Sequence, residues 1–219
     1  MNHTEGFAFY TERRLVALTG LRASNLGGLL RGLKHVPGSS IFYHTHHMYL
    51  SHHFETPAFS NDFALWTSEA LQEERLGEQL SAIDLLSFTS IRELREAVIS
   101  TIEKSIGEDG RRKRECPPDD EFHFCRSKSF IMPTGIAAAD PAEFFRVLPG
   151  VSNISLFFHF FEARLRLERP TNDFSQWLAW LGEPGLAKAI DALDPYSVTL
   201  DELKREIIQL GEGVGRQTQ

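Results

Sequence analysis

The chain has 219 residues and a formal net charge of −7. Hydrophobic residues make up 42% of it, with 17 phenylalanines among them, and 24% of its residues are charged, so it can form a substantial core beneath an ordinary charged surface. The acidic balance argues against a dedicated nucleic-acid binder, because such proteins are basic overall or carry a broad basic stripe.

The N-terminal residues lack the basic stretch and following apolar stretch that mark a secretory signal. No window approaches the roughly 18 consecutive apolar residues that a membrane span requires. The two cysteines, Cys116 and Cys125, are too few for a disulfide scaffold or a structural zinc site. We therefore expect a cytoplasmic protein with reduced thiols and no membrane or nucleic-acid partner.

The first predicted element is a short extended segment at residues 7–9, where large apolar residues alternate along the chain. Thr19-Gly20 is interpreted as a break that follows it. Helices are then expected up to Val36, over residues 40–50, from Asn61, and over residues 90–106.

The second half of the chain predicts the same order of elements, beginning with an extended segment at residues 122–124 and a break at Thr134-Gly135. Asp140 and Pro141, with Glu143 behind them, form a strong helix start, with a capping aspartate, a proline in the first turn and an acid at the third position. Further helices are expected over residues 155–167, from Asn172, and over residues 199–210.

The two halves of the sequence also resemble each other. A shift of 115 residues places Phe7, Phe9, Thr19, Gly20, Ser40, Phe42, His44 and Leu50 on Phe122, Phe124, Thr134, Gly135, Ser155, Phe157, His159 and Leu165. A shift of 111 aligns Asn61, Asp62, Phe63 and Trp66 with Asn172, Asp173, Phe174 and Trp177. We therefore predict a mainly α fold of two tandem homologous helical repeats, each with about five helices after a short extended segment. The predicted parts are a first repeat at 1–106, a linker at 107–121 and a second repeat at 122–219, the repeats being related by a pseudo-two-fold axis.

Three runs of residues carry a resemblance to a known family. They are Ile41-Phe42-Tyr43-His44-Thr45-His46-His47, Asn61-Asp62-Phe63-Ala64-Leu65-Trp66 and Phe157-Phe158-His159-Phe160-Phe161-Glu162-Ala163-Arg164-Leu165-Arg166. Together they resemble a bacterial and archaeal family known as a domain of unknown function, over nearly the whole chain. The resemblance implies a prokaryotic cytoplasmic protein and brings no activity, substrate or catalytic residue with it.

Histidine is the most conspicuous candidate for chemistry, since five histidines fall within ten residues: His44, His46, His47, His52 and His53. Imidazole is the commonest metal ligand, and residues three apart on a helix share a side. The sequence therefore predicts a divalent metal site, for zinc, iron or manganese, formed by His44, His47, His159 and Glu162.

Two alternatives to a metal site remain open. In the first, His44 and His159 are buried polar residues bonded to backbone or to an aspartate, and the other clustered histidines partly face solvent. In the second, the same residues line a ligand pocket that holds no metal. The other candidate ligand-binding residues are Asp62, Asp173, Trp66, Trp177 and Arg164.

Each of these candidates also has a structural interpretation. The aspartates would cap helices, the tryptophans would belong to the core, and Arg164 would pair with Glu162 and Glu168 instead of binding a phosphate or carboxylate.

Two functional hypotheses follow. The first is a non-catalytic module that binds another protein or a small polar ligand in a groove between the repeats, with no cofactor and with homo-oligomerisation as a further option. The second is a metal-dependent enzyme, a hydrolase or oxidase, that uses the four-residue metal site.

Overall fold

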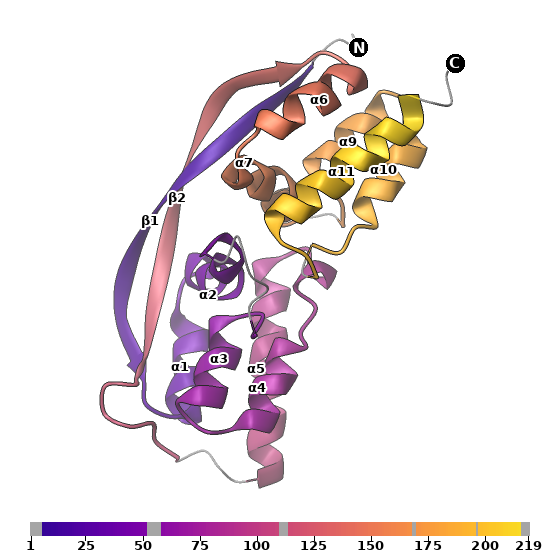
Figure 1. Cartoon of the computed structure of the whole chain (residues 1–219). Helices are drawn as coiled ribbons and strands as arrows, with labels where there is room; N and C mark the ends of the chain where they lie inside the picture. Colours follow the sequence, from indigo (N-terminus) through magenta and orange to yellow (C-terminus); the bar gives the residue numbers. More distant parts are fainter. Residues whose placement is uncertain (1–5, 52–57, 110–113, 168–169, 196, 216–219) are drawn as a thin grey trace. The chain divides into compact units, whose positions relative to one another are not determined.

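The computed structural model describes residues 6–51, 58–109, 114–167, 170–195 and 197–215. Two strands of 17 residues, β1 (Phe7–Ala23) and β2 (Phe122–Ala138), pair in a two-stranded antiparallel sheet (Figure 1). The chain divides into two compact units, and each strand contributes one part to each unit. Unit 1 contains the described residues up to Arg13 and from Ser129 onward, whereas unit 2 contains those between Arg14 and Lys128, without residues 52–56.

The predicted fold class is therefore wrong. The extended segments are long strands and not short leaders of all-helical repeats, so the chain combines helices with a β-ribbon. The predicted parts at 1–106, 107–121 and 122–219 stay a prediction; the compact units are composed differently, since residues 122–128 belong to unit 2 and residues 7–13 to unit 1. The architecture does not show the predicted pair of tandem repeats or the pseudo-two-fold axis.

The Thr-Gly pairs that were interpreted as breaks lie inside the strands. Gly20 and Gly135 have φ angles of +82° and +80°, which glycine adopts without steric cost. The Thr19 hydroxyl donates a 2.8 Å hydrogen bond to the Phe124 carbonyl, and the Thr134 hydroxyl donates one of 2.8 Å to the Phe9 carbonyl. Each threonine therefore links the two strands at the point where the glycine bends its own strand.

Unit 2 packs the first part of β2 against a helical layer. Phe122 and Phe124 are buried, and the alternation of buried and exposed residues along this part is that of a half-buried strand. Gly32 lets a helix approach closely, because a Cβ atom there would lie 2.2 Å from the Phe124 ring. The helices are α1 (Leu26–His35), α2 (Gly38–Ser51), α3 (Asp62–Glu69), α4 (Glu74–Ser81) and α5 (Ile91–Asp109), with a 3₁₀ turn at Leu85–Ser87.

Unit 1 packs the first part of β1 in the same manner. Phe7 and Phe9 are buried, and the Phe7 ring centroid lies 5.6 Å from that of Phe144 and 5.5 Å from that of Trp177. Edge-to-face contacts of this kind stabilise aromatic cores beyond the area they bury. The helices are α6 (Pro141–Val147), α7 (Asn153–Phe157), α8 (Ala163–Leu167), α9 (Asp173–Trp180), α10 (Pro184–Asp191) and α11 (Leu200–Gly215), with a 3₁₀ turn at Leu148–Gly150.

Several local predictions are confirmed. Asp140 caps α6 by accepting a 2.8 Å bond from the Glu143 backbone N–H, as its sequence predicts. The segment at residues 155–167 is helical, although a π-helical turn at Phe158–Glu162 separates α7 from α8. Its counterpart at residues 40–50 lies within α2 and has no such turn.

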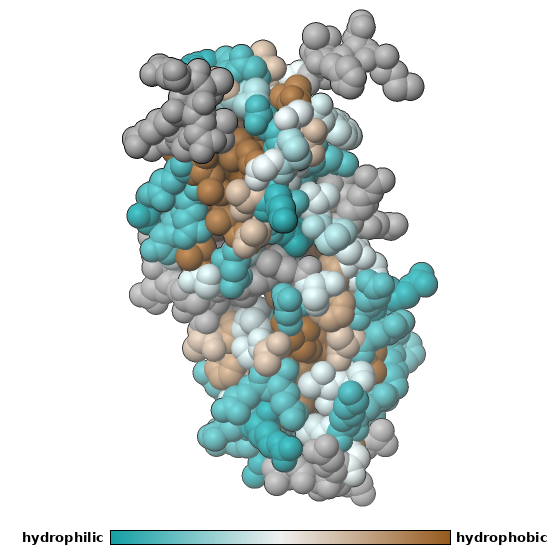
Figure 2. Space-filling view, turned by 90° about the vertical axis from the view of Figure 1, so that its right-hand side faces the viewer, coloured by the Kyte–Doolittle hydropathy of each residue, from teal (hydrophilic) through white to brown (hydrophobic). Residues whose placement is uncertain are grey.

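The surface turned to the viewer in Figure 2 is mostly hydrophilic, with hydrophobic side chains gathered in zones between hydrophilic ones. Within the described part of the chain, no helix combines the length and apolar character needed to cross a bilayer.

Candidate functional site

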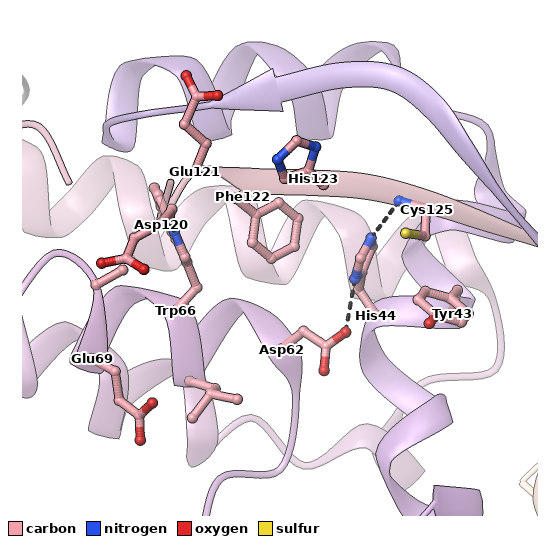
Figure 3. Close-up of a pocket in the computed structure, with 12 residues that line it drawn as sticks. Tyr43, His44, Asp62, Trp66, Glu69, Asp120, Glu121, Phe122, His123 and Cys125 are labelled. Atoms are coloured by element: carbon pink, nitrogen blue, oxygen red, sulfur yellow. Dashed lines mark hydrogen bonds and ion pairs between the residues drawn. The ribbon is translucent and has the colours of Figure 1, made fainter. Parts of the chain in front are cut away.

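A pocket of about 650 Å³ opens in unit 2 between α2, α3 and the first part of β2 (Figure 3). This volume lies within the range of small-molecule sites in proteins. The described residues that line it are Tyr43, His44, Asp62, Leu65, Trp66, Glu69, Ala70, Asp120, Glu121, Phe122, His123 and Cys125. Aromatic and carboxylate side chains therefore dominate the lining.

The His44 side chain connects the three elements that form this pocket. Its Nδ1 lies 2.8 Å from Asp62 Oδ2, and its Nε2 accepts a 2.9 Å hydrogen bond from the Cys125 backbone N–H. Because Nε2 is the acceptor, the ring proton is assigned to Nδ1, which donates it to Asp62. The ring, only 3% exposed, thus joins α2, α3 and β2 in one chain of hydrogen bonds.

The same set of hydrogen bonds occurs in unit 1. His159 Nδ1 lies 2.7 Å from Asp173 Oδ2, and its Nε2 accepts a 2.8 Å bond from the Tyr10 backbone N–H. His159 is also 3% exposed. In both units the histidine fixes a strand to the helical layer, which matches the structural alternative considered for the two residues.

Carboxylates set the electrostatics of the unit 2 pocket. Asp62, Glu69, Asp120 and Glu121 line it, and none of its described lining residues is a lysine or an arginine. Glu121 forms a 2.9 Å ion pair with Arg22, whose side chain is 66% exposed. The lining therefore favours a positively charged ligand.

The pocket environment raises the pKa of two further lining residues. Burial raises the pKa of the Cys125 thiol, and the charge of Asp62 raises it further. Burial also raises the pKa of Tyr43, with contributions from Cys125 and Asp62. Both side chains are therefore protonated at neutral pH, and Tyr43 can act as a hydrogen-bond donor.

Trp66 and Phe122 form the aromatic part of the wall. Their ring centroids lie 5.6 Å apart in an edge-to-face arrangement. The Trp66 indole N–H donates a 2.6 Å hydrogen bond to the Asp120 carbonyl, which ties the segment before β2 to α3. At 9% exposed, Trp66 contributes to the core of unit 2 as well as to the pocket.

The predicted metal residues are distributed over both units, His44 and His47 in unit 2 and His159 and Glu162 in unit 1. Both ring nitrogens of His44 and both of His159 already have hydrogen-bond partners within their own units. Among the described residues, no three or more His, Cys, Asp or Glu side chains are grouped as a metal site would require. The four-residue site stays a prediction, and a metal there would have to displace these bonds.

His46 differs from the expectation that it partly faces solvent. It is 3% exposed, stacks on Phe42 with ring centroids 4.7 Å apart, and places Nδ1 2.7 Å from the Thr45 hydroxyl. Burial and the charge of Arg14 lower its pKa to about 3. It is a neutral core residue, whereas His52 and His53 lie outside the described residues.

The helix caps at the two aspartates belong to their neighbours. Asn61 accepts a 2.9 Å bond from the Ala64 backbone N–H and donates to the Leu80 carbonyl, and Asn172 caps α9 in the same way. The aspartates that follow are thereby left to bind the histidines. Capping and histidine binding are therefore divided between adjacent residues.

The remaining candidates lie mainly in the core. Trp177 is 6% exposed. Arg164 is 7% exposed and donates a 3.4 Å bond to the Asp191 carbonyl, while its expected partner Glu168 lies outside the described residues.

Nine of the twelve lining residues were not predicted as site residues, among them Tyr43, Glu69, Asp120 and Glu121. Glu69 lies seven residues after Asp62, so the helix expected from Asn61 would have placed both acids on one side. Asp120 and Glu121 were assigned to a linker, and no local pattern shows that a linker lines a pocket.

Comparison with known proteins identifies the family of this chain. The model described as "Family of unknown function (DUF5752)" matches residues 4–212. The chain belongs to this family. The resemblance found in the sequence is confirmed to that extent, and a bacterial or archaeal origin stays a prediction.

The solved structure described as "The structure of OrfY from Thermoproteus tenax" is similar to this chain. The two share 27% sequence identity over 95% of each chain, with a TM-score of 0.82. No curated protein matches the chain.

Proposed function

We propose that this chain is a non-catalytic ligand-binding module and that the pocket of unit 2 binds a small, positively charged polar ligand. One observation carries the proposal: four carboxylates line a pocket of about 650 Å³ to which the described residues contribute no lysine or arginine. A pocket of this size can surround much of a small ligand, and its charge selects cations over anions.

The aromatic side chains support an organic cation over a bare ion. Trp66 and Phe122 line the pocket together, and a cationic group over an aromatic face is stabilised by about 0.5–2 kcal/mol. The carboxylates would supply charge-assisted hydrogen bonds to an ammonium or guanidinium group.

The same groups are poorly suited to catalysis. His44 has both ring nitrogens engaged, so it has no free nitrogen to act as a general base. The Cys125 thiol has a raised pKa, and a thiol that stays protonated is a weak nucleophile. Binding is therefore better supported than the alternative of a metal-dependent hydrolase or oxidase, whose predicted ligands include His44.

The test uses three small molecules that share a four-carbon chain: butylamine, butanol and butyrate. Isothermal titration calorimetry at pH 7.5 should give measurable binding of butylamine, weaker or no binding of butanol, and no binding of butyrate. Equal binding of all three, or binding of butyrate alone, would refute the proposal.

A further inference from the structure

The acidic residues of the pocket form two groups, one at each end of α3. Asp62 lies at the start of α3, and Glu69 is its last residue. Residues seven apart lie on the same side of an α-helix, and at 1.5 Å per residue their Cα atoms are roughly 10 Å apart. In Figure 3 Asp62 lies beside His44 and Tyr43, whereas Glu69 and Asp120 lie on the other side of the drawn group.

The region between the two acidic ends is apolar. Leu65 and Trp66, which line the pocket three and four residues after Asp62, lie on the same side of α3. Phe122 of β2 lies between the two ends in Figure 3, and it is 6% exposed. The pocket thus offers negative charge at two separated points and apolar or aromatic surface between them.

The two ends also differ in their hydrogen-bonding groups. At the first, the Asp62 side chain is 26% exposed while Oδ2 binds His44, and the neighbouring Tyr43 hydroxyl can donate or accept. At the second, Glu69 and Asp120 are exposed residues, so their carboxylates can bind a ligand while keeping most of their contact with water. Each end can therefore receive its own cationic group.

We infer that the ligand class is a linear aliphatic diamine or polyamine, bound with one ammonium group at Asp62, the other at Glu69 and Asp120, and its methylene chain along Leu65, Trp66 and Phe122. This inference rests on the proposed function and narrows it. A ligand with two cationic groups roughly 10 Å apart matches the spacing along α3, and a shorter diamine reaches only one end. The second ammonium group acts at high effective concentration once the first is bound.

Unit 1 provides an internal contrast. Asp173 occupies the start of α9, but the residue seven positions later is Trp180, which is 69% exposed. The side of α9 that corresponds to the Asp62–Glu69 side of α3 thus carries a carboxylate at one end only. The inference therefore predicts a diamine site at α3 and none at the corresponding side of α9.

The test compares 1,8-diaminooctane with octylamine, which has the same chain and one charge, and with the short 1,4-diaminobutane. Titration calorimetry at pH 7.5 and low salt should show 1,8-diaminooctane binding with a stoichiometry of one and a Kd at least about fivefold lower than either of the others. Glu69→Gln should weaken the binding of 1,8-diaminooctane by a larger factor than that of octylamine, and so reduce this advantage. Glu78→Gln, the same charge change at an exposed position on α4 outside the pocket, should retain it.

The outcomes separate the two proposals. If octylamine binds but 1,8-diaminooctane binds no more tightly, the diamine inference is wrong and the cation-binding function stands. If no amine binds, both are wrong. Displacement of the diamine by an equal concentration of Mg²⁺, or an equal loss of affinity in Glu69→Gln and Glu78→Gln, would show general attraction to acidic surface and overturn the inference.

Discussion

Replacing His159 by phenylalanine isolates the energetic role of the hydrogen bonds that join strand to helices. Phenylalanine keeps an aromatic ring among the surrounding ones, of which Phe7 lies 4.9 Å and Phe174 5.6 Å away between centroids. It removes both ring nitrogens, and so leaves Asp173 and the Tyr10 backbone N–H without the partner they have in the native unit.

The expected cost follows from the two bonds. The bond from the imidazole to the Asp173 carboxylate involves a charged acceptor and contributes about 2 kcal/mol, and the bond from the Tyr10 N–H contributes about 1 kcal/mol. His159 is 3% exposed and the Asp173 side chain 17% exposed, so water cannot fully replace either bond. We expect the free energy of unfolding to fall by about 3 kcal/mol.

Urea unfolding at pH 7.5, followed by circular dichroism, measures this change. His35→Phe serves as the control, because His35 is exposed and its ring bonds to the Arg31 carbonyl of its own helix, and it should shift the free energy of unfolding by less than about 0.5 kcal/mol. A double-mutant cycle of His159→Phe with Asp173→Ala should give a coupling energy of about 2 kcal/mol. A coupling below about 0.5 kcal/mol would show that the bond geometry does not stabilise unit 1.

Three other substitutions test the packing of unit 2 by the same unfolding assay. The pKa of His46 is about 3 in the folded state and about 6.5 in the unfolded state, so between these pH values the unfolded state binds more protons and the free energy of unfolding falls as the pH falls. The free energy of unfolding of His46→Phe should therefore fall by about 2 kcal/mol less than that of the native chain between pH 7 and pH 5. The same pH dependence in both proteins would contradict this assignment. Gly32→Ala should cost about 1–3 kcal/mol because its Cβ would overlap the Phe124 ring, whereas Gly107→Ala, in open space on α5, should be neutral or stabilising; equal effects of the two would exclude this close approach. Asn61→Ala removes the cap of α3 and a second hydrogen bond, to the α4 backbone, and should lower the free energy of unfolding by about 2 kcal/mol. A much smaller decrease would mean that water replaces both bonds.

The predictions that rest on local chemistry agree with the structure. The Asp140 cap depends only on a side chain and the backbone three residues ahead, so the short motif is sufficient to predict it. Leu203 and Ile207 are buried on α11, as their helical spacing predicts. The alternation at Phe122 and Phe124 likewise indicated a half-buried extended segment, although its length was underestimated.

The candidate site was predictable only in part. His44, Asp62 and Trp66 were identified from the sequence, and all three line the pocket. Their roles were not: the helical spacing paired His44 with His47, while its partners are Asp62 and the Cys125 backbone, 18 and 81 residues away. Spacing within one helix carries no information about partners that other elements supply.

The sequence by itself determined most of the helices, the Asp140 cap, the buried aromatic positions and the membership of a family, because each depends on short-range periodicity or on residue identity. Tertiary structure alone decided that each strand is divided between two units. The first seven residues or so of each strand lie beside the helices of one unit, and the remaining residues belong to the other unit. Leu15, Val16 and Leu18, in the second part of β1, are apolar yet exposed, so the helices of unit 2 do not cover these positions. Only the packing of distant segments fixes where that cover ends, and the same packing brings Asp120 and Glu121 to the end of α3.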